Sequence, residues 1–185
     1  MQIDIENGLL KNVLQVPSPN FNLRPEGNVI DLIVVHNISL PPGEFGGPHI
    51  NAFFTNTLES QLHPYFEEIK DLKTSCHCLI RRTGEIIQYV PFTARAWHAG
   101  ASSFRGRENC NDFSIGIELE GTDEIPYTDL QYSNLMTVIS LLQKVYPEIT
   151  HERIVGHSTI APNRKTDPGP AFDWNRLNRL MLQSV

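Results

Sequence analysis

The pattern of apolar and polar residues predicts short strands in the first half of the chain. Residues 29–35, VIDLIVV, form a β-branched run too brief for a typical helix, so we expect a buried strand that ends at His36. Residues 77–90 are typical of two strands joined at Gly84, since glycine readily adopts the positive φ of a tight turn. The sequence therefore predicts at least one antiparallel pair of strands.

A third strand is predicted at residues 113–119, FSIGIEL, where apolar and small or polar residues alternate. Successive side chains of a strand point to opposite faces, so Phe113, Ile115, Ile117 and Leu119 share one face. Glu118 then lies on the opposite face, away from these apolar side chains.

The second half of the chain predicts helices. Thr128 and Gln131 have the spacing of a capping box, and apolar residues at helical spacing follow it until Pro147. A last helix is expected to begin near Asp173, with an inward stripe that packs in the core, comprising Trp174, Leu177, Leu180 and Met181. Together with the strands, these helices predict an α/β fold, a single domain with a central mixed β-sheet flanked by helices.

Composition favours one compact domain. The chain has 185 residues, 40% of them hydrophobic, and contains no repeat or Gly/Ser linker, so we expect one domain over 1–185 with its core at about 16–182. The acidic start of the chain lacks the features of a secretory signal, and no apolar run reaches the ~18 residues of a membrane span. Three cysteines are odd in number and too few for a disulfide framework. These features predict a cytoplasmic protein with free thiols.

Charge narrows the choice of partners. The net charge of −6 would repel nucleic acid and anionic membranes, so we expect neither partner. No feature of the sequence predicts an obligate protein partner.

Three residues far apart in the chain suggest a metal site. His36 and His157 both follow apolar runs, LIVVH and IVGH, which could bring two imidazoles to the same rim of a sheet. Asp167 lies in a proline-rich loop, and Pro168 biases its backbone away from helical angles. Two histidines and a carboxylate suit a catalytic zinc ion with one open position. Spacing alone leaves open that each histidine is simply a hydrogen-bonded structural residue.

Two further residues are candidates for catalytic roles beside the metal site. Lys165, two residues before Asp167, could stabilise a developing oxyanion, or it could be an ordinary solvated lysine. Glu118 could act as a general base for a water molecule beside the metal, or it could be a surface carboxylate. Glu118 and Glu120 could also suggest a glycosidase, but carboxylates two residues apart on one strand sit side by side and cannot face each other across a bond.

Four long blocks carry a resemblance to a known family. The segments VVHNISLPPGEFGGP, HCLIRRTGEIIQYVPF, RAWHAGASSFRGRENCNDFSIGIELEGTD and RKTDPGPAFDW resemble the zinc-dependent N-acetylmuramoyl-L-alanine amidases, a group related to a phage lysozyme and to peptidoglycan recognition proteins. The similarity covers about residues 16–174, nearly the whole chain.

The resemblance implies a function and a set of roles. It implies one Zn²⁺ per chain, held by His36, His157 and Asp167, with Glu118 as the base and Lys165 as the oxyanion stabiliser. The implied reaction hydrolyses the amide between the lactyl group of 1,6-anhydro-N-acetylmuramic acid and L-alanine of the stem peptide. An anhydro-muropeptide is then the expected substrate, in cytoplasmic peptidoglycan recycling, with an indirect effect on β-lactamase induction.

The sequence also suggests residues that could contact the substrate. Trp97 and His98 could line the sugar or peptide groove or pack within a loop, and Asn37 could hydrogen-bond substrate or cap a turn. Lys73 and Arg107 are candidate partners for an acidic stem peptide.

Two other functions remain open. Some relatives bind peptidoglycan without cleaving it, so the alternative is a non-catalytic muropeptide-binding module; loss of a ligand or of the catalytic pair would signal it, and all five residues are present. A general zinc peptidase is disfavoured because the chain has no H-E-x-x-H helix.

Overall fold

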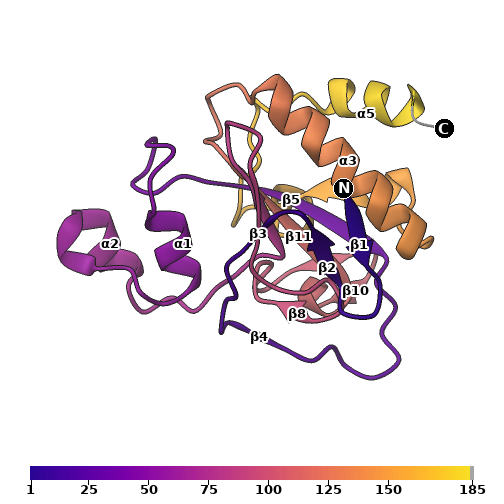
Figure 1. Cartoon of the computed structure of the whole chain (residues 1–185), viewed down its shortest axis with the longest axis horizontal. Coiled ribbons are helices and arrows are strands. Elements are labelled where there is room, and N and C mark those ends of the chain that lie inside the picture. The colour runs from indigo at the N-terminus through magenta and orange to yellow at the C-terminus, as the bar shows by residue number, and fades with distance from the viewer. Residues whose placement is uncertain (184–185) are drawn as a thin grey trace.

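The computed structural model of the chain describes residues 1–183, so the last two residues of the predicted domain, 184–185, lie outside the described residues. The fold has short strands throughout and two long helices near its C-terminal end (Figure 1). The strands are β1 (Gln2–Asp4), β2 (Leu9–Lys11), β3 (Leu14–Gln15), β4 (Phe21–Asn22), β5 (Leu32–Ile38), β6 (Cys78–Ile80), β7 (Ile86–Gln88), β8 (Arg95–Ala96), β9 (Ser103–Phe104), β10 (Arg107–Glu108), β11 (Ser114–Glu120) and β12 (Ile154–Gly156). The helices are α1 (His49–Phe54), α2 (Pro64–Ile69), α3 (Asp129–Val145), α4 (His157–Ile160) and α5 (Trp174–Gln183), with 3₁₀ turns at Ser60–Leu62, Cys110–Asp112 and His151–Arg153.

The central sheet is mixed, which confirms the predicted fold class. Its order is β12-β5-β11-β6-β7-β3, and all neighbours run parallel except the β6–β7 hairpin. Gly84 lies in the connection of that hairpin with a φ of +84°, the conformation that a side chain would strain.

Strand β5 corrects one predicted boundary. It begins at Leu32, not at residue 29, and continues past His36 to Ile38. The extension has a partner, because β11 pairs with β5 in parallel as far as Glu120, opposite Ile38. His36 therefore lies within a strand, directly beside Glu118 in the register.

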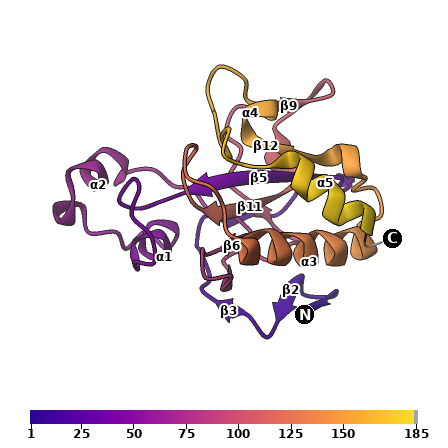
Figure 2. The same cartoon turned by 90° about the horizontal axis from the view of Figure 1, so that it is seen from above.

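One face of the sheet, which we call the first face, is covered by α3 and α5. These helices lie side by side along the sheet in both views (Figures 1 and 2). The odd-numbered residues of β11, together with Ile33 and Val35 of β5, pack there against Leu135, Ile139 and Leu177. Trp174 and Leu180 pack at its edge and Met181 is buried, as the predicted stripe requires.

The opposite face, which we call the second face, carries two separate apolar clusters. One joins β6 and β7 to the α1–α2 lobe, and includes Leu79, Phe54 and Phe66. The other lies beyond β5 and includes Leu32, Val34 and Phe113, so Phe113 does not share the first face with the rest of its predicted set. The reason is local, since Phe113 precedes β11 and ends a 3₁₀ turn with a ψ of 8°.

The space between these clusters is polar. His36 continues the parity of Leu32 and Val34 on β5, and Glu118 lies opposite it on β11. Apolar packing on both sides thus frames a row of polar side chains on the second face.

Helix α3 starts with the predicted capping box. Thr128 Oγ1 accepts from the Gln131 N–H at 3.2 Å, and Gln131 Oε1 accepts from the Thr128 N–H at 3.0 Å. Gln131 Nε2 also donates to the carbonyls of Ile80 and Glu120, which ties the helix start to two strand ends. The box therefore fixes both the helix and its position on the sheet.

Thr128→Ala is expected to lower the free energy of unfolding by about 1 kcal/mol, because it leaves a helix N-terminal N–H without its acceptor. Denaturant unfolding measures the loss. Thr137→Ala is the matched control, since Thr137 lies within the same helix, where alanine is a better helix former. Equal losses in both variants would contradict a specific capping contribution.

Within residues 1–183, no helix combines the length and apolar character needed to cross a bilayer.

Candidate functional site

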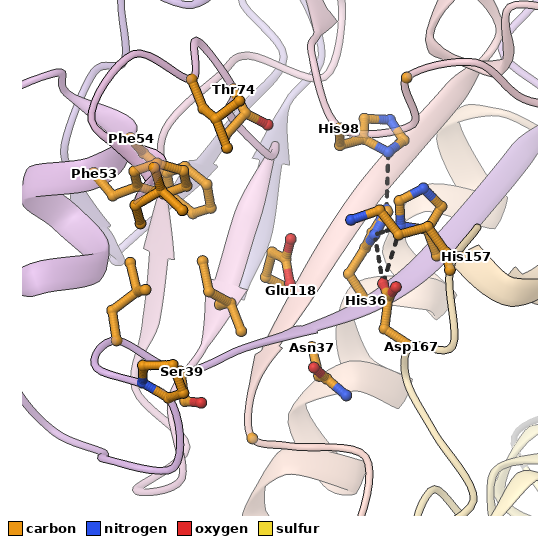
Figure 3. Close-up of a pocket in the computed structure, with 18 of the residues that line it drawn as sticks. His36, Asn37, Ser39, Phe53, Phe54, Thr74, His98, Glu118, His157 and Asp167 are labelled. Carbon is orange, nitrogen blue, oxygen red and sulfur yellow. Dashed lines mark hydrogen bonds and ion pairs between the residues drawn. The ribbon is translucent and has the colours of Figure 1, made fainter. Parts of the chain in front are cut away.

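A pocket of about 800 Å³ opens on the second face. Its walls come from the end of β5 and the loop after it, the α1–α2 lobe, the loop around Trp97, β11, and the loop at 164–167. Figure 3 shows a polar cluster on one side of this pocket and the aromatic pair Phe53 and Phe54 on the other. The pocket therefore joins a polar centre to an apolar wall.

The polar cluster brings together the three predicted metal ligands. His36 Nδ1 lies 3.0 Å from His157 Nδ1 and 3.1 Å from Asp167 Oδ2, and His157 Nδ1 lies 3.1 Å from the same oxygen. Figure 3 shows the three side chains converging from separate segments. His157 directly follows β12, as its sequence pattern predicted.

The outer nitrogens of the two imidazoles are also engaged. His157 Nε2 lies 3.2 Å from the Ala99 carbonyl, and His36 Nε2 lies 2.9 Å from His98 Nδ1. A carbonyl can only accept, so His157 Nε2 donates to it, and a ring with a single proton then presents a lone pair at Nδ1. The inner atoms of the cluster are thus available as electron-pair donors.

The protonation states favour cation binding at neutral pH. Burial lowers the pKa of His36 to about 4, so this ring is neutral. Burial alone would raise the pKa of Asp167, but hydrogen bonds and charge from His157 and His36 hold it below its usual range whenever these rings carry a proton on Nδ1. Metal ligands must be deprotonated, and these groups already are.

The geometry of the three donor atoms fits a tetrahedral metal. In tetrahedral zinc sites with ligands at about 2.0–2.1 Å, neighbouring ligand atoms lie roughly 3.3 Å apart. The 3.0–3.1 Å sides of the triangle are close to this spacing. Two imidazoles and one carboxylate are a donor set that suits zinc.

Glu118 projects into the pocket beside this cluster (Figure 3). Its side chain is only 9% exposed, and its Oε2 has no hydrogen-bond partner among the described residues. Burial raises the pKa of Glu118 well above 4.5, the charge of Asp167 raises it further, and Lys165 opposes both. A buried carboxyl with one unpartnered oxygen and a raised pKa is typical of a group that transfers protons.

Four other predicted residues line the same pocket, and they are Asn37, Lys73, Trp97 and Lys165. Asn37 Nδ2 donates to Asp123 Oδ1 at 2.8 Å, and Trp97 Nε1 donates to Asn22 Oδ1 at 2.7 Å. Lys73 and Lys165 are exposed at its edge. The structure thus brings these side chains to one cavity.

Arg107 and His98 differ from these four in where their contacts lie. Arg107 lies outside the pocket lining, where it pairs with Asp31 at 2.6 Å and stacks on the Phe113 ring at 3.7 Å. These contacts neutralise its charge and tie it to the fold. His98 does line the pocket, but both ring nitrogens are engaged, one by His36 and one by Ser114. The hydrogen bonds of His98 connect the ligand cluster to Ser114.

The glycosidase alternative also fails on geometry. Glu120 is buried in an ion pair with Arg81 at 3.1 Å and accepts from the backbone N–H groups of Gly46 and Arg82. It is a structural carboxylate, so Glu118 has no catalytic carboxylate opposite it on this strand.

Sequence reasoning missed Asn111 and Ser114. Asn111 Oδ1 accepts from the N–H groups of His98 and Ala99, and Ser114 Oγ lies 3.1 Å from His98 Nε2. Both residues act through contacts 12 to 16 residues away in the chain, and no periodic pattern signals such contacts.

Comparison with known proteins agrees with this geometry. Residues 26–170 match the family described as N-acetylmuramoyl-L-alanine amidase. The 1,6-anhydro-N-acetylmuramyl-L-alanine amidase AmpD of Escherichia coli is 59% identical over 181 residues, 98% of each chain. The crystal structure of a selenomethionine derivative of AmpD superposes with a TM-score of 0.94, at 58% identity, over 97% of this chain and 99% of that one.

A more distant structure holds a ligand. The N-acetylmuramyl-L-alanine amidase AmiD of E. coli, solved with the substrate anhydro-N-acetylmuramic acid-L-Ala-D-γ-Glu-L-Lys, is 28% identical with a TM-score of 0.60. The match covers 85% of this chain and 60% of that one. From the family match over residues 26–170 and the near full-length identity to AmpD of E. coli, we conclude that this chain belongs to the N-acetylmuramoyl-L-alanine amidase family.

Proposed function

We propose that the chain hydrolyses the amide bond between the lactyl group of 1,6-anhydro-N-acetylmuramic acid and L-alanine of the stem peptide, with one zinc ion per chain. The observation that carries the proposal is the triangle of three electron-pair donors beside Glu118, whose buried Oε2 has no hydrogen-bond partner among the described residues. The name of the E. coli relative supports the anhydro sugar, and the ligand of AmiD supports a muropeptide in this fold.

His36, His157 and Asp167 would hold the zinc ion through Nδ1, Nδ1 and Oδ2. When bound, zinc supplies Lewis-acid chemistry, since it polarises a carbonyl and makes water more acidic. The remaining protein chemistry falls to the pocket side chains.

Glu118 transfers a proton from the attacking water to the leaving nitrogen. Its carboxylate takes a proton from the attacking water as the C–O bond forms at the lactyl carbonyl carbon. The same carboxyl then gives that proton to the alanine nitrogen as the C–N bond breaks, because an amide anion is a very poor leaving group. A raised pKa suits both steps, since it makes the carboxylate a stronger base and keeps the acid form available near neutral pH.

Lys165 stabilises negative charge. Its ammonium group lines the pocket, and its charge lowers the pKa of both Glu118 and His36, so its field reaches the reacting centre. A cation held there favours the oxyanion that develops on the lactyl oxygen.

The other lining residues contact the substrate body. Lys73 offers a cation to the carboxylates of the stem peptide, Asn37 offers an amide, and Trp97 offers an aromatic face.

The setting that we propose is cytoplasmic peptidoglycan recycling, in which removal of signalling muropeptides also restrains β-lactamase induction. The three cysteines are buried and free, which is typical of a reducing compartment.

One assay tests the function. Purified protein is incubated with an anhydro-muropeptide, with and without a zinc chelator, and the products are identified by mass. We expect the anhydro sugar and a free peptide that together gain one water, and no cleavage with chelator. Intact muropeptide that stays bound to the zinc-loaded protein would overturn the amidase and favour a binding module.

A further inference from the structure

We infer that His98 is a positioning residue that fixes which nitrogen of His36 binds the metal, through a chain of hydrogen bonds that runs from the Cys110 carbonyl. The inference rests on the proposed zinc site and extends it to side chains that do not contact the ion.

The chain of hydrogen bonds starts at the Cys110 carbonyl, which can only accept a hydrogen bond. Ser114 Oγ lies 2.6 Å from the Cys110 carbonyl oxygen, which can only accept, so the single hydroxyl proton of Ser114 points there. Ser114 Oγ also lies 3.1 Å from His98 Nε2. With its proton already used, the hydroxyl oxygen must accept in this second contact, so His98 carries a proton on Nε2.

The next contact determines which nitrogen of His36 is protonated. A neutral imidazole protonated at Nε2 presents an acceptor at Nδ1. His98 Nδ1 lies 2.9 Å from His36 Nε2, so His36 Nε2 donates. The proton of His36 is therefore on its outer nitrogen, and the lone pair at Nδ1 faces His157 and Asp167.

Burial keeps this chain of contacts intact. His98 is 7% exposed, His36 is 2% exposed and Ser114 is fully buried. Water cannot readily replace the partners of these groups, so each contact constrains the next.

The backbone holds His98 where the contact needs it. Asn111 Oδ1 accepts from the N–H groups of His98 and Ala99 at 3.1 and 2.8 Å. Gly116 of β11 leaves the space for the ring, because a Cβ there would lie 2.4 Å from His98 Cγ. The adjacent Ala99 carbonyl accepts from His157 Nε2. One two-residue segment thus orients both histidines of the site.

Outer contacts of this kind fix the tautomer and ring orientation of a metal ligand, and their loss typically weakens metal binding 10–100-fold. We therefore expect His98→Leu, which removes the acceptor, to weaken zinc binding about 10–100-fold in competition with a chelator. His98→Asn places Oδ1 near the lost Nδ1 and should restore binding to within a few-fold of the unaltered protein.

His77→Leu is the matched control. His77 is a fully buried histidine whose ring centroid lies 5.7 Å from that of His98, and it hydrogen-bonds Gly116 and Ala94 without contacting the three ligands. This variant should lower the thermal stability of the metal-free protein and leave the zinc affinity of the folded protein unchanged. Equal loss of zinc affinity in the His77 and His98 variants would show a purely structural effect and overturn the inference.

A second measurement on the unaltered protein keeps the inference testable even if the His98 variants fail to fold. Long-range ¹H–¹⁵N NMR of the zinc-loaded, unaltered protein reports which imidazole nitrogen is protonated. We expect a proton on Nε2 of both His36 and His98, and Ser114→Ala should mix the two tautomers of His98. The inference would be overturned, with the proposed function unaffected, if zinc were bound to Nε2 of His36. The same holds if His98→Leu bound zinc as tightly as the parent. Failure of the parent to bind zinc would overturn the proposed function as well.

Discussion

Glu118→Gln is expected to lower the rate of muropeptide hydrolysis on the order of 10²–10⁴-fold while zinc stays bound, because glutamine keeps the shape of the side chain but cannot transfer a proton. Glu118 does not belong to the three-atom cluster, so the ligand set is complete in the variant. Zinc content and turnover of the same preparation provide the measurement. Full activity in this variant would remove Glu118 from the mechanism.

The same substitution has a second, independent consequence for stability. Burial raises the pKa of Glu118 above 4.5, so between that pH and its folded pKa the native state binds more protons than the unfolded state. The stability that the protonated carboxyl contributes is therefore present below about pH 4.5 and is lost as the pH rises through the folded pKa. Metal-free Glu118→Gln should lose less stability than the metal-free parent as the pH is raised over this range.

Thermal unfolding of both metal-free proteins as a function of pH checks this sign. Parallel pH profiles would indicate that the Glu118 carboxyl is not perturbed in the fold. An inactive variant that is more stable than its parent at neutral pH would instead show a catalytic group held at a cost to the fold.

The parts of the fold that follow from short-range patterns could be predicted from the sequence. The turn at Gly84 and the capping box of Thr128 depend on neighbouring residues, and both are confirmed. The alternation predicted for 113–119 is confirmed except at Phe113, which precedes β11. The start of β5 could not be predicted, because Asp31 leaves the β-branched run to pair with Arg107 and Arg153. These partners are 76 and 122 residues away.

Some residues of the candidate site could likewise be predicted from local sequence patterns, and others could not. Histidines after apolar runs and an aspartate in a stiff loop have local signatures, and the structure brings them together. Arg107 looked like a free cation because its carboxylate partner is distant in the chain. The contacts of His98 with Ser114 and Gly116 could not be predicted, because only the fold brings β11 beside His98. Which polar residue faces solvent and which faces another polar residue is decided by tertiary contacts.

Asp167→Ala is expected to weaken zinc binding by more than the 10–100-fold typical of an outer contact, and to reduce hydrolysis to the level seen with chelator. The substitution leaves two imidazoles whose Nδ1 atoms lie 3.0 Å apart, without the carboxylate that balances the charge of the ion. Two neutral ligands hold a divalent cation far less tightly than the complete set.

The variant should still fold, because backbone contacts hold the loop around Asp167. Its own carbonyl accepts from the Ser158 N–H at 3.0 Å, and the Pro168 carbonyl accepts from the Tyr127 hydroxyl at 2.8 Å. Loss of the carboxylate leaves both contacts in place. A change in zinc content can therefore be read as a ligand effect, with circular dichroism of the metal-free protein as the check on folding.

Asp123→Asn is the matched control for this experiment. Asp123 is a carboxylate in the same pocket, but it accepts from Asn37 and is not part of the three-atom cluster. The Asp123→Asn variant should bind zinc as tightly as the parent, whereas Asp167→Ala should bind it much more weakly. Competition with a chelator and metal content after dialysis measure the difference. Zinc stoichiometry and affinity that stay unchanged in Asp167→Ala would count against Asp167 as a ligand, and the triangle of donors would then have to be explained by hydrogen bonding alone.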